Sequence, residues 1–207
     1  MKRKNIIEAP MGEKTVLLHT CCAPCSSAII EAMLANGITP VIYYCNPNIY
    51  PQQEYEIRKD ECARYAKSLG LEIVDADYDH ENWLEAMKGL EAEPERGGRC
   101  LKCFKIRLLR TAEYAASRGI KVITTTLASS RWKSLDQIIE AGTWACGEVK
   151  ISDSRPGVEA SPVMVPVFWD YNWKKGGLQE RRLQIIKEYD FYNQLYCGCE
   201  FSMRKED

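Results

Sequence analysis

Short apolar runs alternate with amphipathic stretches along most of this chain. The runs at residues 15–19 and 121–127 are rich in Val, Leu, Ile and Thr, which is typical of buried strands. Between the runs, apolar residues recur at helical spacing, and the stretch over residues 55–69 ends at Gly70. The pattern predicts strands at 15–19, 40–44, 71–75 and 121–127, and helices at 26–36, 55–69, 83–90, 101–117 and from 135 onward.

Strands that alternate with helices indicate parallel crossovers. We therefore predict one α/β domain over residues 1–207, with a mostly parallel sheet and helices on both faces. Residues after about 160 have a less regular pattern, and we expect them to complete a functional site. Residues 91–98 and 152–161 are rich in charge, Gly or Pro, and we expect them to interrupt the fold at the surface.

Composition adds limits on function. The chain has 28 Lys and Arg residues against 29 Asp and Glu residues, a net charge of -1. A protein with so little net charge has no overall field that attracts RNA, so any RNA contact depends on a local basic patch. No apolar run is long enough to span a membrane, and the basic N-terminus lacks the apolar core of a signal peptide. These features predict a cytoplasmic location.

Seven of the ten cysteines form three tight groups. They are Cys21, Cys22 and Cys25; Cys100 and Cys103; and Cys197 and Cys199. One tetrahedral zinc or one cubane iron–sulfur cluster takes four ligands, so seven thiols exceed one such site. The α/β pattern and chain length disfavour a secreted disulfide scaffold and favour metal binding or catalysis. Of the isolated cysteines, we interpret Cys62 and Cys146 as small buried apolar side chains, whereas Cys45 ends a predicted strand.

The first group follows the first predicted strand and precedes the first predicted helix. Ligands of open parallel sheets bind beyond the carboxyl ends of strands, and a helix N-terminus favours the thiolate form that binds metal. A redox pair at Cys22 and Cys25, as in thioredoxin-like proteins, is the alternative. The other two groups favour metal, and Cys100 and Cys103 also start a predicted helix. For the C-terminal pair, a structural zinc clip is the alternative.

Three motifs carry a resemblance to a known family. They are His19-Thr20-Cys21-Cys22-Ala23-Pro24-Cys25, Gly98-Arg99-Cys100-Leu101-Lys102-Cys103-Phe104 and Tyr196-Cys197-Gly198-Cys199-Glu200-Phe201-Ser202. With further matches at 43–49, 124–127 and 170–172, residues 15–203 resemble the cobalamin-independent epoxyqueuosine reductases. Two places depart from the family pattern. Residues 129–133 read Ser-Ser-Arg-Trp-Lys instead of the commoner Ser-Pro-Tyr-Lys, and residues 170–172 read Asp-Tyr-Asn where Asp-Phe-Arg is common.

The resemblance implies a Rossmann-like, nucleotide alpha-hydrolase-like fold and the last step of queuosine synthesis. In that step, epoxyqueuosine at the wobble position of tRNA loses its epoxide oxygen in a two-electron reduction. The resemblance also implies an iron–sulfur centre without cobalamin, which we expect to be a [4Fe–4S] cluster with an additional mononuclear iron. The expected partners are the tRNA anticodon loop and a reducing protein or small-molecule electron donor.

Two of the cysteine groups open helices at the presumed carboxyl edge of the sheet, and we expect the cluster to bind there. The expected cluster ligands are Cys21, Cys22, Cys100 and Cys103. The remaining thiols are left for the second metal and are Cys25, Cys197 and Cys199.

Other polar and aromatic residues are candidates for the reaction or for RNA. Asp170 is the first candidate for proton transfer or iron binding, with a turn or helix-cap role as the alternative. His19 is the second catalytic candidate, and a backbone-bonded histidine is the alternative; His80 is expected at the surface. The expected substrate contacts are Arg99, Trp132, Lys133 and Tyr171. Aromatic side chains stack on unpaired RNA bases, although core packing is their commoner role.

Two basic runs are candidates for a phosphate-contacting patch, and solvated helix faces are the alternative. They are Lys102, Lys105, Arg107 and Arg110, and Lys174, Lys175, Arg181 and Arg182.

Two other function classes stay open. A sulfur-transferring or nucleotide-activating tRNA enzyme needs a glycine-rich phosphate loop after the first strand, and residues 20–25 read Thr-Cys-Cys-Ala-Pro-Cys instead. The other is a metal-stabilised RNA-binding protein without catalysis. A visible spectrum separates the zinc-bound form of that protein from an iron–sulfur enzyme, because zinc is colourless and a cubane cluster is brown.

Overall fold

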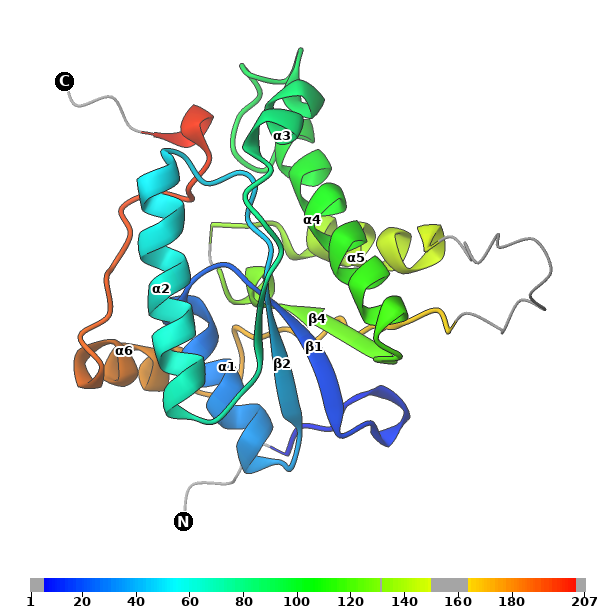
Figure 1. The fold of residues 1–207 in the computed structure, drawn as a ribbon, viewed down its shortest axis with the longest axis vertical. Coiled ribbons are helices and arrows are strands. Elements are labelled where there is room, and N and C mark those ends of the chain that lie inside the picture. Colours follow the sequence, from blue (N-terminus) through cyan, green and yellow to red (C-terminus); the bar gives the residue numbers. More distant parts are fainter. Residues whose placement is uncertain (1–5, 131, 150–163, 204–207) are drawn as a thin grey trace.

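The computed structural model describes residues 6–130, 132–149 and 164–203, and it has helices packed around one sheet (Figure 1). The strands are β1 (Thr15–Thr20), β2 (Thr39–Tyr44), β3 (Ile73–Asp75), β4 (Val122–Thr125) and β5 (Val167–Phe168). The α-helices are α1 (Ala23–Ala35), α2 (Gln52–Ser68), α3 (His80–Met87), α4 (Gly98–Ser117), α5 (Leu135–Glu148) and α6 (Leu178–Glu188). Short 3-10 helices span Pro10–Gly12, Thr126–Ser129 and Glu200–Ser202.

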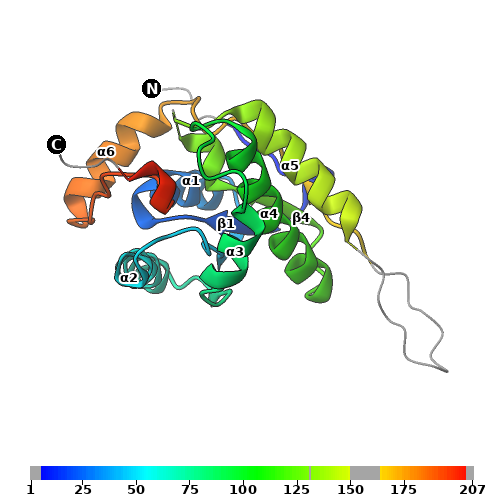
Figure 2. The same ribbon diagram turned by 90° about the horizontal axis from the view of Figure 1, so that it is seen from above.

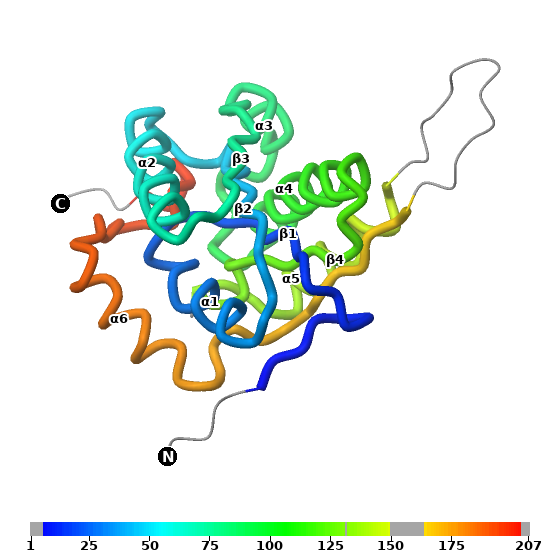
Figure 3. Tube along the Cα trace, turned by 60° about the horizontal axis from the view of Figure 1, so that its bottom comes forward, coloured from blue at the N-terminus to red at the C-terminus, as the bar shows by residue number. Residues whose placement is uncertain are grey.

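The five strands form one parallel sheet in the order β3-β2-β1-β4-β5. Helices α1, α2 and α6 lie on one side of this sheet, and α4 and α5 lie on the other (Figures 1 and 3). Helix α3 packs on α4. This arrangement confirms the predicted α/β fold with helices on both faces of a parallel sheet.

Several helices begin earlier than the sequence pattern predicts. Cys22 is the N-cap of α1 and Pro24 occupies its first turn, where proline is tolerated because the first amides have no intrahelical partner. Cys25 therefore lies in the first turn of α1 rather than before it. Helix α4 begins at Gly98, which places Arg99 and Cys100 in its first turn.

The chain after residue 164 is more regular than predicted. It adds the edge strand β5, which pairs with β4, and the helix α6, which packs on α1. A segment over residues 192–203, which we call the C-terminal strap, then returns from α6 to the N-terminal end of α2 (Figures 2 and 3). The predicted interruption at 152–161 lies outside the described residues, whereas the one at 91–98 consists mainly of turns.

The core forms where the sheet meets the helices. Val16, Leu17 and Leu18 of β1 have no exposed surface, because helices cover both faces of the central strand. Cys62 and Cys146 are buried in the same core, which confirms their interpretation as small apolar side chains.

Gly142 lies where α5 meets β5, and it provides a test of this packing. A Cβ atom at Gly142 would lie 2.4 Å from the ring of Phe168, whereas a Cβ at Gly147 of the same helix would have no atom within 4 Å. We expect Gly142→Ala to lower the free energy of unfolding by about 1–3 kcal/mol through overpacking. The matched Gly147→Ala should leave it unchanged or raise it by up to about 1 kcal/mol. Urea unfolding midpoints measure both, and equal stability of the two variants would contradict the described α5–β5 contact.

Candidate metal centre

The candidate site lies beyond the carboxyl end of the central strand. β1 pairs with β2 on one side and with β4 on the other, so crossovers leave the sheet centre in opposite directions. Open parallel sheets bind ligands at such a switch point. His19 of β1 lies beside Thr125 of β4 in register, and the first cysteine group follows two residues later.

The first cysteine group is compact. The sulfur atoms of Cys21, Cys22 and Cys25 all lie within 4.8 Å of one another, and those of Cys21 and Cys22 are 3.8 Å apart. Hydrogen bonds from the Cys22 and Cys25 thiols lower the pKa of Cys21 well below its usual value. Burial raises the pKa of Cys22, and the hydrogen bond with Cys21 raises that of Cys25 to about 12. Cys21 is therefore the thiol of this group that ionises most readily, and the three sulfurs can hold a metal ion.

Polar groups from two other segments contact these sulfurs. The Thr126 hydroxyl accepts from the Cys21 backbone N–H at 3.3 Å and donates to the Cys21 sulfur at 3.5 Å. From the C-terminal strap, the Gln194 amide donates to the Cys22 sulfur at 2.9 Å. Sequence reasoning missed Gln194, because no local pattern indicates that a residue so far along the chain returns to the first motif.

The second and third cysteine groups lie against each other. Cys103 of α4 and Cys199 of the strap are buried in one small apolar cluster with Trp83 and Met87 of α3. Burial raises the pKa of Cys103, and the nearby Arg107 guanidinium opposes that rise. The backbone N–H of Arg96 donates to the Cys100 sulfur at 3.3 Å. Burial, together with the nearby Cys103, raises the pKa of Cys199 to about 12.

Two cations lie between the cysteine groups. Burial lowers the pKa of Lys133, but the nearby Cys197, Cys21 and Cys25 thiols more than offset this effect and raise it above its usual value. Burial also lowers the pKa of Arg107, but nearby thiols, of which Cys103 has the largest effect, raise it above its usual value. Buried cations are stable only beside negative charge, so this environment favours thiolates.

The C-terminal strap is fixed by a buried ion pair. Arg58 of α2 has 2% of its surface exposed, and its Nη2 atom lies 2.6 Å from Glu54 Oε1. The guanidinium also donates to the carbonyl oxygens of Tyr196 and Cys197, both at 3.3 Å. Gly198 has a φ of +106°, and its carbonyl accepts from the Tyr50 N–H at 2.9 Å. These contacts set the position of Cys197 and Cys199.

His19 is fully buried and both of its ring nitrogens are bonded. Nε2 lies 3.0 Å from the Cys45 carbonyl oxygen, and Nδ1 lies 2.7 Å from the Thr125 hydroxyl. Burial, with a smaller contribution from Arg107, lowers the pKa of His19 to about 3, so the ring is neutral at pH 7. A carbonyl only accepts, so Nε2 carries the proton and Nδ1 accepts from Thr125. This environment matches the backbone-bonded alternative, and a catalytic role for His19 stays a prediction.

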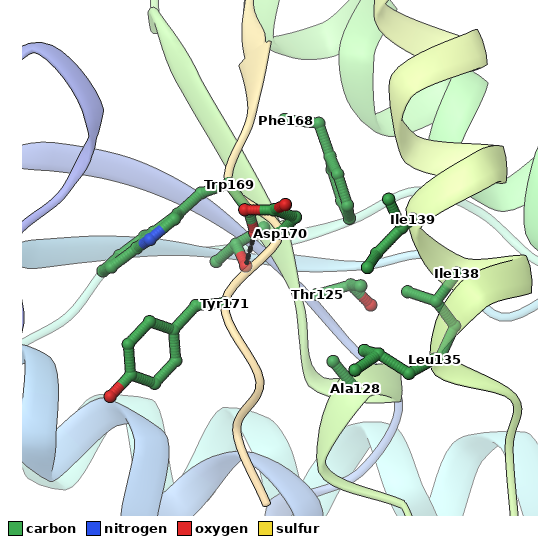
Figure 4. A pocket seen from close by; sticks show the side chains of 10 residues that line it. Thr125, Ala128, Leu135, Ile138, Ile139, Phe168, Trp169, Asp170 and Tyr171 are labelled. Carbon is green, nitrogen blue, oxygen red and sulfur yellow. Dashed lines mark hydrogen bonds between the residues drawn. The ribbon is translucent and has the colours of Figure 1, made fainter. Parts of the chain in front are cut away.

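Asp170 lies at the carboxyl end of β5, where Figure 4 shows it beside Phe168 and Tyr171. Its side chain is exposed, and it lines a narrow pocket that cysteines do not line. The ring of Tyr171 packs against Trp173 at a centroid distance of 4.5 Å. Proton transfer by Asp170 and base stacking by Tyr171 stay predictions.

The other candidate residues have different surroundings. Arg99 is buried, and its guanidinium donates to the carbonyl oxygens of the turn at residues 90–93. Trp132 is 57% exposed, whereas Lys133 is half-buried beside the thiols. The expectation that His80 lies at the surface is wrong, because its ring stacks between aromatic rings and bonds to the Pro47 carbonyl at 2.7 Å. Substrate contacts by Arg99, Trp132 and Lys133 stay predictions.

Several residues of the two basic runs have other partners. Lys105 pairs with Glu140, Arg181 pairs with Glu31 and Glu188, and Arg107 is buried. Lys102 and Lys175 are exposed and can meet an external anion.

The observed groups fit a thiolate-bound metal. Soft thiolate ligands select zinc, copper(I) or iron–sulfur clusters, and the site adds two cations, buried Arg107 and half-buried Lys133, that offset thiolate charge. The predicted division of ligands does not follow the observed groups, because it assigns neighbouring thiols to different metals. Cys21 and Cys103 are assigned to the cluster, whereas Cys25 and Cys199 are assigned to the second metal. That division stays a prediction.

Comparisons with known proteins match almost the whole chain. The family model described as epoxyqueuosine reductase QueH covers residues 16–205. A relative from Haemophilus influenzae of that name is 46% identical over 96% of this chain and 75% of its own length. Relatives of the same name from Acinetobacter baylyi and Thermotoga maritima are 42% and 33% identical, over 84% and 90% of their own lengths. Among the described residues, no helix combines the length and apolarity needed to cross a membrane.

The geometry at Gly198 generates a test of the metal centre. A Cβ atom there would lie 2.9 Å from Ile49 Cγ1 and 3.0 Å from Arg58 Nη1, in a backbone conformation that L-residues rarely adopt. Strain of about 1–2 kcal/mol is released if the strap moves, so we expect Gly198→Ala to weaken metal binding about tenfold or more. Elemental analysis after dialysis against a chelator measures the metal retained.

Gly177→Ala is the matched control. Gly177 also has a positive φ, of +73°, but a Cβ there would have no atom within 4 Å. Equal metal retention in both variants would show that the position of the strap does not affect metal binding.

Proposed function

We propose that this chain, which belongs to the QueH family of epoxyqueuosine reductases, reduces epoxyqueuosine to queuosine in tRNA. The observation that carries the proposal is the compact group of Cys21, Cys22 and Cys25 at the switch point of the sheet, in a chain that matches this family over residues 16–205. The burial of Cys103 and Cys199, from the other two motifs, in one cluster supports it. The match to relatives over 96% of the chain supports the same reaction.

The reaction removes the epoxide oxygen as water and leaves a carbon–carbon double bond. It takes two electrons and two protons for each epoxide. The proposed cofactors are a [4Fe–4S] cluster, which supplies electrons one at a time, and a mononuclear iron that polarises the oxygen. Cobalamin has no part in the proposal.

The chain's own residues divide the remaining tasks. Cys21, Cys22, Cys100 and Cys103 are the proposed cluster ligands, and Cys25, Cys197 and Cys199 are proposed for the second metal. Asp170 is the proposed carboxylic acid for proton transfer. His19 is the second candidate, although its neutral ring has both nitrogens bonded.

The proposed substrate is the anticodon loop of tRNA. Exposed Trp132 offers a ring for base stacking, and the exposed amines of Lys102 and Lys175 offer charge for phosphates. A reducing protein or small molecule supplies the electrons, and we expect the reaction in the cytoplasm.

The assay for the proposed function uses anaerobic, iron-loaded protein with a low-potential reductant. We expect tRNA or an anticodon stem-loop that carries epoxyqueuosine to yield queuosine without added cobalamin, because the proposed centre supplies both electrons. Mass spectrometry of digested nucleosides measures the loss of one oxygen atom. Iron- and sulfide-loaded protein that leaves the epoxide unchanged would refute the assignment, and tRNA binding without reduction would favour an RNA-binding protein.

The proposed ligand division has its own test. We expect Cys100→Ala and Cys103→Ala to lose most of the roughly four irons of a cubane, because a missing thiolate exposes one iron. Cys197→Ala and Cys199→Ala should retain more iron and sulfide but show little activity. Cys146→Ala, a change in the core at a thiol whose pKa is shifted by burial alone, is the control. Equal cluster loss in all four variants would indicate that these cysteines share one site, as the burial of Cys103 and Cys199 in one cluster would allow.

A further inference from the structure

Arg107 lies inside the protein, at the junction of three segments that form the site. It belongs to α4, one helical turn after Cys103, so both side chains lie on one face of that helix. Its Nε donates to the Cys45 carbonyl oxygen at 3.1 Å, and its Nη2 donates to Asn46 Oδ1 at 2.5 Å. The same Cys45 carbonyl accepts from His19 Nε2, at the end of β1. These bonds hold the guanidinium beside the carboxyl ends of β1 and β2, where the first cysteine group begins.

The guanidinium has no carboxylate partner among the residues that the structure describes. Only 2% of Arg107 is exposed, so water does not solvate its charge, and the Cys45 carbonyl and Asn46 amide oxygens that accept from it are neutral. Arg58, another deeply buried arginine in this region, pairs with Glu54 instead. Burial lowers the pKa of Arg107, but the thiols of Cys103, Cys21 and Cys197 more than offset this effect and raise it. A nearby anion stabilises a buried, permanently charged group with neutral bonding partners, and these sulfurs can supply that anion when they ionise.

We propose that Arg107 is the counter-ion of the metal centre, a positioned positive charge that offsets the thiolates and raises the reduction potential of the cluster. This inference rests on the proposed iron–sulfur centre. Each one-electron reduction adds a negative charge to the cluster. A fixed cation nearby stabilises the reduced state more than the oxidised state, and the low dielectric of a buried site strengthens that effect.

The test compares wild-type protein with Arg107→Gln and Arg107→Lys. All three are reconstituted with iron and sulfide under anaerobic conditions, and the cluster is titrated electrochemically. At a fixed poise, we expect Arg107→Gln to lower the ratio of reduced to oxidised cluster about tenfold or more, equivalent to about 59 mV for one electron. Arg107→Lys keeps the charge and should stay within about threefold of wild type. Lys105→Gln removes one charge from the same helix, where Lys105 pairs with Glu140, and should also match wild type.

The outcomes separate this inference from the proposed function. Loss of the cluster in Arg107→Gln but not in Arg107→Lys also supports a counter-ion, because the charge is then needed to hold the thiolates. Wild-type cluster content and potential in Arg107→Gln would overturn the inference while leaving the reductase proposal intact. An equal change in Arg107→Gln and Arg107→Lys would also overturn it, because charge would not be the cause. Wild-type protein that takes up no cluster would overturn the proposed function itself.

Discussion

Parallel pairing of β1 with both β2 and β4 is the constraint on which the rest of this structure depends. It brings the carboxyl ends of three strands to one edge of the sheet, and it makes the helices diverge at that point. The first cysteine group, the 3-10 helix at Thr126–Ser129 and the Cys45 carbonyl meet there because their strands end together. A sheet with another strand order would separate these groups.

The C-terminal strap depends on packing rather than on regular structure. Its residues 192–199 form little secondary structure, yet they contact the site at several points. Arg58 holds two of its carbonyls, the Tyr192 hydroxyl donates to Glu54 at 2.8 Å, and Gln194 reaches the Cys22 sulfur. The buried Arg58–Glu54 pair thus couples helix α2 to the position of the third cysteine motif.

Charge is distributed unevenly despite a net charge of -1. Acidic and basic side chains pair at the surface, as Arg181 does with Glu31, whereas Arg107 and Lys133 lie inward among thiols. A carboxylate partner would neutralise these cations within the protein. Thiols can neutralise these cations only when the sulfurs ionise, and metal binding promotes that ionisation.

The sequence by itself determined the α/β fold and most helices and strands, because periodicity is a local property. It also showed the resemblance of three cysteine motifs to one family, because each motif is a short local stretch. It also identified Cys62 and Cys146 as core residues. It did not predict β5 and α6, since their patterns are short or weak, or the stacking of His80 between aromatic rings. Only the tertiary structure decided which thiols are neighbours. It also decided that Gln194 bonds to the Cys22 sulfur, Arg58 to the Cys197 carbonyl and Arg107 to the Cys45 carbonyl. Such contacts join residues up to 172 positions apart, and no local pattern records them.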